Sequence, residues 1–432
     1  MTPRLVQADS RGRIREKPSL LMLVNRGGRF SLPGKGDLIP LPGESELFLL
    51  PGRKSLGLDA RSGKFVPGGG IAVAAFAAPG HTLGAHPAYE QEADAPILPL
   101  FAYGAVGYAR GRFWLAARKV DEDRRQCFAD IGEGKIEREA DRLLKRHSVN
   151  RLVAHIINNC VRRYACPAAR NFALGRYEAP LPTSRSCPAR CIGCISWQDG
   201  SSPIETTPQC RLSFVPTPEE IAEVMRIHEG RERRTPIYSF GQGCEGDPLV
   251  NGPLLCEAVA TFRKGSGHGT VNCNTNGCNP EAVAALAASG LTSMRVSLNS
   301  ARPDCYNAYY RPRNYDFLAV KESIKVARRA GVFVSLNLLY FPGITDVKSE
   351  IAALAELCKK CGVEMVQLRN LNIDPVWYAA QPDVHGKSAS LEPALGPKLF
   401  MRELQKSCPW LRFGYFNPYL GDRARLNSPM PV

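Results

Sequence analysis

The stretch Ser186-Cys-Pro-Ala-Arg-Cys-Ile-Gly-Cys194 holds three cysteines, Cys187, Cys191 and Cys194, in the spacing C-x3-C-x2-C. A structural zinc site or an ordinary four-cysteine iron–sulfur cluster needs one more protein ligand. Three closely spaced thiolates suit a four-iron, four-sulfur (4Fe-4S) cluster that keeps one iron free of protein ligands. Gly193 relieves crowding beside Cys194. The motif therefore predicts a cluster with an open coordination site.

After this loop, apolar strands alternate with amphipathic helices. Thr217 is expected to cap a helix that starts at Pro218, with Glu220 completing a capping box. Asn279-Pro280-Glu281 opens another helix, which is expected to end at Gly290. With a strand leading into the cysteine loop, the pattern gives about six β/α units. Such a series predicts a parallel sheet in an open, partial TIM-like barrel, with reactive groups at the carboxyl ends of the strands.

The rest of the chain divides by composition. Residues 1–118 are rich in Gly and Pro between short apolar runs, which predicts a small, mostly β domain. Residues 119–179 form a helical, Arg-rich connecting segment, and residues 180–375 form the partial barrel. Residues 376–432 form a Pro-rich carboxyl-terminal extension, with a helix expected near 394–407 and a strand in "RFGYF".

The composition indicates a soluble globular protein. The chain has 432 residues, of which 44% are hydrophobic and 22% charged. No apolar run reaches the roughly 18 residues of a membrane span, and the first residues lack the apolar core of a secretory signal. Fifteen cysteines in such a chain favour metal or thiol chemistry over a disulfide framework. We therefore expect a cytoplasmic protein without a membrane partner.

The formal net charge of +15 is unevenly distributed. Residues 151–186 carry 6 Lys or Arg against 1 Asp or Glu, with Tyr164, Phe172 and Tyr177 among the arginines. Such a segment is suited to bind phosphates or single-stranded RNA. The alternative is a packed helix with a solvated basic face.

The cysteine motif at the head of a β/α series resembles the signature of the radical S-adenosylmethionine (radical SAM) superfamily. The resemblance implies that the open iron binds the amino and carboxylate groups of S-adenosylmethionine. It also implies that one electron, from a donor such as flavodoxin or ferredoxin, cleaves the sulfonium to methionine and a 5′-deoxyadenosyl radical. In the family, the residue before the third cysteine is usually an aromatic that contacts the adenine. Here it is Gly193, and Trp197 is a candidate replacement.

A second resemblance lies in "SFGQGCEGDPL", which is similar to the family's glycine-rich, acidic turn after the second strand. In the family this turn holds the methionine amino group. The resemblance implies a role in binding S-adenosylmethionine for Gly243, Glu245, Gly246, Asp247 and Pro248. The required carboxylate is either that of Glu245 or that of Asp247, and the sequence leaves both open.

Later strands supply the other candidates for the cofactor site. By resemblance, Ser297 and Asn299 in "RVSLNSA" meet the ribose or the methionine carboxylate, and Arg311 binds the carboxylate. The alternatives are satisfied polar groups at a strand end and a surface arginine. Gly343 in "YFPGITD" is either near the adenine or a plain turn glycine. Gln367 and Arg369 are candidate substrate contacts, and the sequence assigns no catalytic residue.

The remaining cysteines are less specific. Cys160 and Cys166 are candidates for a second iron–sulfur cluster, completed by Cys127 or Cys210, or else buried or redox-active thiols. Cys358 and Cys361 share a helical stripe with Ile351 and Leu354 and are expected in the core. Three more cysteines fall at or near predicted strand ends, where one could bind a substrate or donate hydrogen to it: Cys244, Cys273 and Cys278.

Three functions follow from this sequence. The favoured one is a radical SAM enzyme acting on a peptide, a protein or RNA, which the amino-terminal domain and the Arg-rich segment would help to bind. The second is the same chemistry on a small molecule, with the amino-terminal domain capping the barrel. The third is a non-catalytic iron–sulfur protein for electron transfer or scaffolding, against which stand the missing fourth cysteine and the acidic turn.

Overall fold

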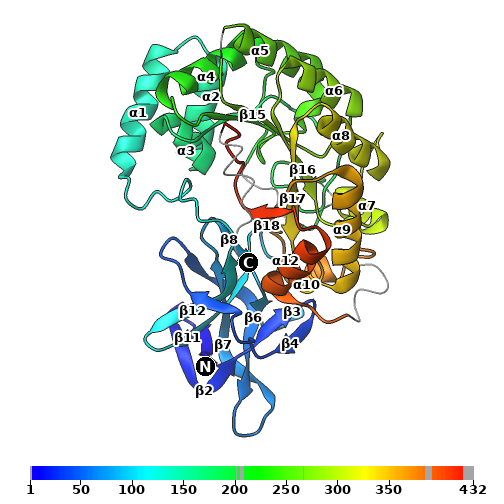
Figure 1. Ribbon diagram of the computed structural model, residues 1–432. Coiled ribbons are helices and arrows are strands. Elements are labelled where there is room, and N and C mark those ends of the chain that lie inside the picture. The colour runs from blue at the N-terminus through cyan, green and yellow to red at the C-terminus, as the bar shows by residue number, and fades with distance from the viewer. Residues whose placement is uncertain (1, 201, 205–208, 266, 385–391, 422–432) are drawn as a thin grey trace.

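The computed structural model describes residues 2–200, 202–204, 209–265, 267–384 and 392–421. Figure 1 shows a β-rich amino-terminal part, a helical segment, and a barrel with its helices on the outside. The predicted architecture, a partial α/β barrel preceded by a mostly β domain, is confirmed. In the described part of the chain, no helix combines the length and the apolar character needed to cross a bilayer.

The amino-terminal part is built on a nine-stranded antiparallel sheet, in the order β10-β6-β2-β1-β7-β11-β12-β5 with β8 paired to β12. Apolar side chains of its long strands, among them Val6, Val73 and Leu115, form its own core. Three short strands make a second sheet, in the order β4-β3-β9. The strands are β1 (Arg4–Ala8), β2 (Ile14–Met22), β3 (Val24–Arg26), β4 (Arg29–Ser31), β5 (Leu38–Pro40), β6 (Glu46–Asp59), β7 (Phe65–Phe76), β8 (His81–Leu83), β9 (His86–Pro87), β10 (Tyr89–Gln91), β11 (Gly104–Ala109) and β12 (Arg112–Lys119).

The connecting segment is helical, but it is not regular. It contains α1 (Glu133–Arg146), α2 (Arg151–His155), the π-helix η1 (Ile156–Arg163) and α3 (Pro167–Leu174). Asn150 caps α2 by accepting a hydrogen bond from the Val153 amide, 2.9 Å away. The helix predicted around Cys160 therefore widens into a π-helix, a feature that periodicity alone does not reveal.

Seven parallel strands form the barrel sheet, in sequence order from β13 to β19. They are β13 (Glu178–Leu181), β14 (Ile237–Phe240), β15 (Thr270–Thr275), β16 (Ser293–Leu298), β17 (Phe333–Tyr340), β18 (Met365–Asn370) and β19 (Arg412–Gly414). The last strand comes from the carboxyl-terminal region and adds a short seventh strand to the six predicted β/α units. The order is that of an open barrel, because β13 and β19 lie at opposite ends of the path.

The helices start and end where the sequence signals predict. Thr217 and Glu220 form the expected capping box at the start of α4, and Asn279 and Gly290 bound α6. The barrel helices are α4 (Pro218–Arg231), η2 (Pro248–Asn251), α5 (Gly252–Lys264), α6 (Pro280–Ser289), α7 (Pro303–Tyr310), α8 (Phe317–Arg329), α9 (Lys348–Cys361), α10 (Pro375–Ala379) and α12 (Gly396–Ser407).

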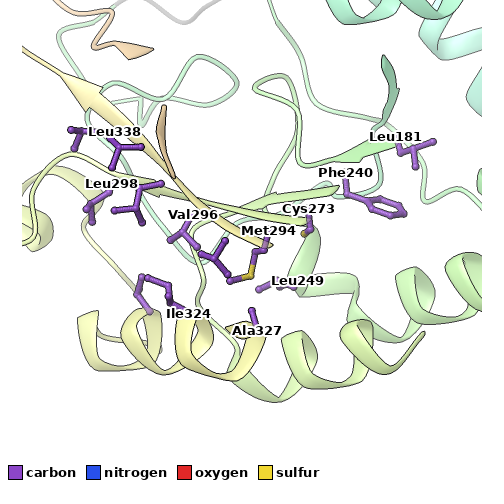
Figure 2. Close-up of a cluster of buried hydrophobic side chains, with 14 of the residues drawn as sticks. Leu181, Phe240, Leu249, Cys273, Met294, Val296, Leu298, Ile324, Ala327 and Leu338 are labelled. Carbon is purple, nitrogen blue, oxygen red and sulfur yellow. The ribbon is translucent and has the colours of Figure 1, made fainter. Parts of the chain in front are cut away.

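Alternating side chains give each barrel strand an outer and an inner face. On β16, Met294, Val296 and Leu298 point toward the helices and pack with Ile324 and Ala327 of α8 (Figure 2). The intervening positions of the strand therefore face the barrel interior. This register places polar side chains inside the barrel, where they line the site described below.

The lower interior of the barrel is closed by a buried hydrogen-bond network rather than by apolar packing. Glu178 accepts hydrogen bonds from Ser239 and from Asn417. Asn417 in turn accepts one from Gln367, at 3.3 Å. Arg125 of the connecting segment donates to the carbonyl oxygen of Asn417, 2.8 Å away. The carboxyl-terminal region thus supplies one of the groups that close the barrel.

The amino-terminal part packs against β18 and the loop that follows it. Arg53 and Asp374 form a fully buried ion pair, with nitrogen and oxygen 2.7 Å apart. The hydroxyl of Thr82 donates to the carbonyl oxygen of Leu368, and the Leu83 amide donates to Oδ1 of Asn370. Removing one partner of a buried ion pair costs about 3–5 kcal/mol, so this contact fixes the two parts together.

Candidate functional site

A polar cavity of about 340 Å³ lies at the carboxyl ends of the barrel strands. All three motif cysteines line it, together with the acidic turn after β14 and the inner faces of β16 to β18. Its lining includes Cys187, Cys191, Gly193, Cys194, Arg211, Gly243, Glu245, Gly246, Asp247, Asn276, Arg295, Ser297, Tyr309, Tyr310, Asn337 and Arg369. The fold thus brings together segments more than 150 residues apart, at the edge where parallel strands present reactive groups.

Several hydrogen-bond donors point at the sulfur atoms of the cysteine loop. The Ala189 amide donates to Sγ of Cys187 at 3.4 Å, and the Asn276 side chain donates to the same sulfur at 3.7 Å. Arg211 donates to Sγ of Cys194 at 3.9 Å. Donors of this kind stabilise thiolates and adjust the potential of iron–sulfur clusters.

The cysteine loop is an unfavourable place for free thiolates. Burial raises the pKa of Cys187 to about 12, and burial and the neighbouring thiols raise that of Cys191 well above its ordinary value. A bound metal would offset that cost, because it takes up the negative charge. Among the described residues, no three His, Cys, Asp or Glu side chains are arranged to hold a single metal ion. Three thiolates around a cavity suit a cluster, in which each binds a different iron.

The acidic turn after β14 packs directly on the cysteine loop. The Gly246 amide donates to the carbonyl oxygen of Ser184, and the Asp247 amide donates to that of Ser186. A Cβ atom on Gly246 would lie 1.8 Å from the Ser186 oxygen, so only glycine fits there. The turn therefore fixes the start of the cysteine loop.

Both candidate carboxylates of this turn are buried and line the cavity. Glu245 accepts hydrogen bonds from the amides of Thr183 and Ser184, at 2.6 and 2.8 Å. Asp247 accepts them from the Thr275 hydroxyl and from the Asn276 amide, at 2.8 and 2.7 Å. Burial raises the pKa of Glu245 to about 7 and raises that of Asp247, in both cases against these hydrogen bonds.

Neither carboxylate has a cationic partner. Within the described ranges, no ion pair includes Glu245 or Asp247. Their raised pKa values follow from desolvation without a compensating positive charge. A ligand ammonium group entering the cavity would supply that charge. The choice between the two carboxylates stays open, because both have this environment.

Three buried polar atoms in the cavity wall have no partner in the described structure. They are Nε of Arg295, Oη of Tyr310 and Oδ1 of Asn337. Buried polar groups are nearly always hydrogen-bonded, so unpaired ones facing a cavity indicate a polar ligand. With the thiols and the uncompensated carboxylates, these atoms fit a cluster and a zwitterionic cofactor such as S-adenosylmethionine.

The other predicted cofactor residues lie at the edge of this cavity or outside it. Ser297 lines it, whereas Pro248 is buried at the start of η2. Asn299 is buried and donates to the Cys305 carbonyl oxygen at 3.0 Å. Arg311 lines a separate hollow together with Trp197. Gly343 packs on the amino-terminal part, where the Gly27 amide donates to the Pro342 carbonyl oxygen.

Tyr309 is a cavity residue that the sequence analysis missed. A Cβ atom on Gly193 would lie 2.9 Å from the Tyr309 hydroxyl, so the ring stands beside the missing side chain. Trp197, the predicted replacement, is stacked under Arg190 at 4.3 Å and does not line the cavity. Gly193 itself was the sequence signal for this contact. A glycine at the position where the family usually has an aromatic residue implies that another side chain fills that space.

The candidates for a second cluster are only partly brought together: the Cys166 amide donates to the Cys160 carbonyl oxygen at 2.8 Å. Cys160 lies on the π-helix, with its thiol in hydrogen-bonding contact with that of Cys244. Cys127 contacts Arg124 instead, and Cys210 is exposed. In the part of the chain that the structure describes, no group of three such side chains could hold a metal ion. We therefore propose one cluster and not two.

The Arg-rich segment packs on its own neighbours. Arg162 pairs with Glu137 and Asp141, and Arg170 pairs with Glu133. Phe172, one of the aromatics expected to stack on RNA, is fully buried in the core. This segment therefore corresponds to the packed alternative and does not offer that side chain to a ligand.

Comparisons with known proteins agree with this geometry. A family model described as "Radical SAM superfamily" matches residues 181–358. No curated protein matches the chain. Similar solved structures include HydG, a maturase of the [FeFe]-hydrogenase, with 17% identity, a TM-score of 0.38 and coverage of 66% of each chain.

Two further structures show the same level of similarity. Methylornithine synthase (PylB) has 12% identity and a TM-score of 0.38, over 65% of this chain and 77% of that one. SuiB of Streptococcus suis, bound to its precursor peptide SuiA, has 14% identity and a TM-score of 0.33, over 47% and 43%. The chain spans just under two thirds of HydG, and similarities this distant say nothing about its substrate.

The family match begins in β13 and runs into α9. It therefore includes the cysteine loop, the acidic turn and the inner face of β16, which the fold gathers around one cavity. Sequence family and geometry agree on the same stretch, and residues 181–358 match the radical SAM superfamily.

Proposed function

We propose that this protein binds one 4Fe-4S cluster through Cys187, Cys191 and Cys194 and cleaves S-adenosylmethionine reductively. The observation that carries the proposal is the single cavity shared by three thiols and two buried carboxylates without cationic partners. When bound, the cluster supplies one electron, and cleavage of the sulfonium gives methionine and a 5′-deoxyadenosyl radical. An external donor such as flavodoxin or ferredoxin would provide that electron.

The residues of the chain position the cofactor and shield it. Glu245 and Asp247 provide negative charge for the methionine ammonium group, and their own hydrogen bonds hold them in place. Tyr309 provides an aromatic surface next to Gly193, where the family usually carries its own. Ser297 is available to the ribose or the carboxylate from the inner face of β16.

The test is anaerobic reconstitution of the full chain with iron and sulfide, followed by turnover under a strong reductant. We expect about four irons per chain and formation of 5′-deoxyadenosine from S-adenosylmethionine. Omitting the reductant should abolish the product but leave the iron bound. A reconstituted protein that holds its iron and forms no 5′-deoxyadenosine would instead be an electron-transfer or scaffold protein.

We also propose that the amino-terminal domain, residues 1–118, controls access to the cavity. Asn370 and the two residues after it line the cavity. The Asn370 side chain also forms hydrogen bonds with the backbone of His81 and Leu83 in that domain. A peptide, protein or RNA substrate would meet this domain at the mouth of the barrel. Peptide or RNA retained through purification, and released as the salt concentration rises, would support a macromolecular substrate. A purified protein that carries neither would favour a small molecule.

A further inference from the structure

Two arginines, Arg295 and Arg369, line the cavity from strands β16 and β18. The loop follows β13, which stands at one end of the sheet, whereas Arg295 is on β16 and Arg369 on β18. Both side chains line the same cavity as the cysteines. The cavity therefore contains these two arginines in addition to Arg211, the thiols and the two carboxylates.

Each arginine is held by neutral groups. Arg295 donates from Nη1 to Oε1 of Gln367, 3.0 Å away, while its Nε is buried without a partner in the described structure. Arg369 stacks on Tyr415, 3.9 Å from the ring centroid, and donates to the carbonyl oxygen of the same residue at 3.2 Å. These contacts orient the guanidinium groups without neutralising them.

No carboxylate pairs with either arginine among the residues described. Glu178 acts on Arg295 through its charge, but its own hydrogen bonds come from Ser239 and Asn417. Burial and the charge of Arg369 together lower the pKa of Arg295 to about 10. Two adjacent cations in a buried site are unfavourable, and a bound anion would relieve that cost.

The strand register places the two arginines relative to Ser297, the residue proposed for the ribose. Arg295 is two residues before Ser297 on the same strand face, which places it roughly 7 Å deeper in the barrel. Asn337, whose unpaired Oδ1 faces the same cavity, is paired in register with Gln367 on β18. Asn337 is also in register with Ser297, whereas Arg369 lies two residues beyond Gln367, toward the mouth of the barrel. Arg295 and Arg369 thus lie one step below and one step above the level of Ser297.

We propose that Arg295 and Arg369 bind a carboxylate or phosphate group of the substrate. This inference rests on the proposed function, because S-adenosylmethionine must occupy the cavity beside the cysteine loop. The family resemblance places both the amino and the carboxylate group of that cofactor at the open iron, beside the cysteine loop. The two arginines are then free for the molecule from which hydrogen is abstracted. Guanidinium groups are well matched to either anion, since they donate two parallel hydrogen bonds.

The test uses the cluster-loaded full chain without reductant, with malonate and inorganic phosphate as probes. Calorimetry measures the binding of each probe with and without saturating S-adenosylmethionine. The variants are Arg295→Gln and Arg369→Gln, with Arg329→Gln as the matched control on the exposed face of α8. We expect at least one probe to bind the protein loaded with S-adenosylmethionine. Each cavity variant should weaken it about tenfold or more, and the control should leave it unchanged.

The two probes separate a carboxylate site from a phosphate site. The proposal is overturned if neither probe binds the wild type, if both cavity variants bind as tightly as the control, or if S-adenosylmethionine displaces the anion. The last result would assign the arginines to the methionine carboxylate. Arg295→Lys and Arg369→Lys keep the charge and should recover part of the binding, which distinguishes charge from damage to the fold.

Failure of the proposed function would look different. It would appear as a wild-type protein that forms no 5′-deoxyadenosine under reductant, whereas anion binding is measured without cleavage.

Discussion

Two groups of three cysteines occur in this barrel, and they differ in almost everything but number. Cys187, Cys191 and Cys194 line a polar cavity, and the sulfurs of Cys187 and Cys194 accept hydrogen bonds from amide and guanidinium groups. Cys358 and Cys361 on α9 and Cys408 at the end of α12 are buried in the apolar core. Burial raises thiol pKa values in both groups, so acidity does not tell them apart.

The difference lies in what surrounds the sulfur. In the core group, the Cys408 thiol donates to the Ala355 carbonyl oxygen at 3.6 Å, and all three cysteines belong to the hydrophobic core. Such thiols behave as small hydrophobic side chains. A cysteine group becomes a candidate metal site when it faces a cavity that holds donors for sulfur and unpaired polar groups for a ligand.

The largest expected effect is the loss of the cavity group. Cys187→Ala should reduce bound iron to near background and abolish 5′-deoxyadenosine, because two thiolates do not retain the cluster. Iron counting and product analysis after anaerobic reconstitution measure both quantities. Cys361→Ala is the matched control and should bind as much iron as the wild type. Full iron loading in Cys187→Ala would break the distinction between the groups.

The next effect is on stability and should be confined to the core group. Cys358→Ser places a hydroxyl in an apolar site, and we expect it to lower the free energy of unfolding by about 1–3 kcal/mol. Denaturant unfolding of the iron-free protein measures the loss. Iron content and turnover of the folded variant should be unchanged. A variant with normal stability and depleted iron would show that this group also ligates metal.

A pH experiment sharpens the contrast by probing the apolar core alone. His228 is buried against Phe172 and Tyr238, and burial lowers its pKa from 6.5 to about 4. The unfolded chain takes up the proton near pH 6.5 and the folded one only near pH 4. Stability is therefore complete above pH 6.5 and falls as the pH decreases toward 4, by about 2 kcal/mol at pH 5.

The variant that checks this slope is His228→Gln, measured with and without Cys187→Ala. Glutamine can still donate to the Tyr177 carbonyl oxygen, the partner of Nε2 in the wild type. Stability of the glutamine variant should depend less steeply on pH between 6.5 and 4. The same slope in both backgrounds places the effect in the core, and an unchanged slope in His228→Gln contradicts the assignment.

The smallest effect should come from the glycine of the motif. Gly193→Ala forces the Tyr309 hydroxyl to move, because the added carbon would lie 2.9 Å from it. We expect affinity for S-adenosylmethionine to fall by a factor of about two to five, under 1 kcal/mol. Tyr309→Phe in the same chain should restore it. Equal affinities in Gly193→Ala and the wild type would show that Tyr309 does not approach the ligand.

The barrel could be predicted because its signals are local. The capping box at Thr217 and the Asn279 and Gly290 boundaries depend on residues at fixed short spacing, and the structure confirms them. The three motif cysteines are likewise close in sequence, so their shared cavity follows from one loop. The core position of Cys358 and Cys361 followed from helical periodicity and is also confirmed.

The remaining parts of the site depend on long-range packing. Tyr309 reaches Gly193 from α7, more than 100 residues later, and no local pattern announces that contact. Arg295 could have been found from the period of two that links it to Ser297. Its lack of a carboxylate partner became visible only in three dimensions. The π-helix at Cys160 was not predicted either, because its side-chain pattern resembles that of an α-helix.

The contact between Glu178 and Asn417 has a consequence for how the protein forms. The two residues are 239 positions apart, at the first strand of the barrel and just after the last. During synthesis, strands β13 to β18 leave the ribosome before Asn417 is available. Until then Glu178 lacks that partner, and the buried hydrogen-bond network that closes the lower interior of the barrel is incomplete. A cluster whose insertion required this closed network would therefore be inserted only after Asn417 has left the ribosome, later than strands β13 to β18.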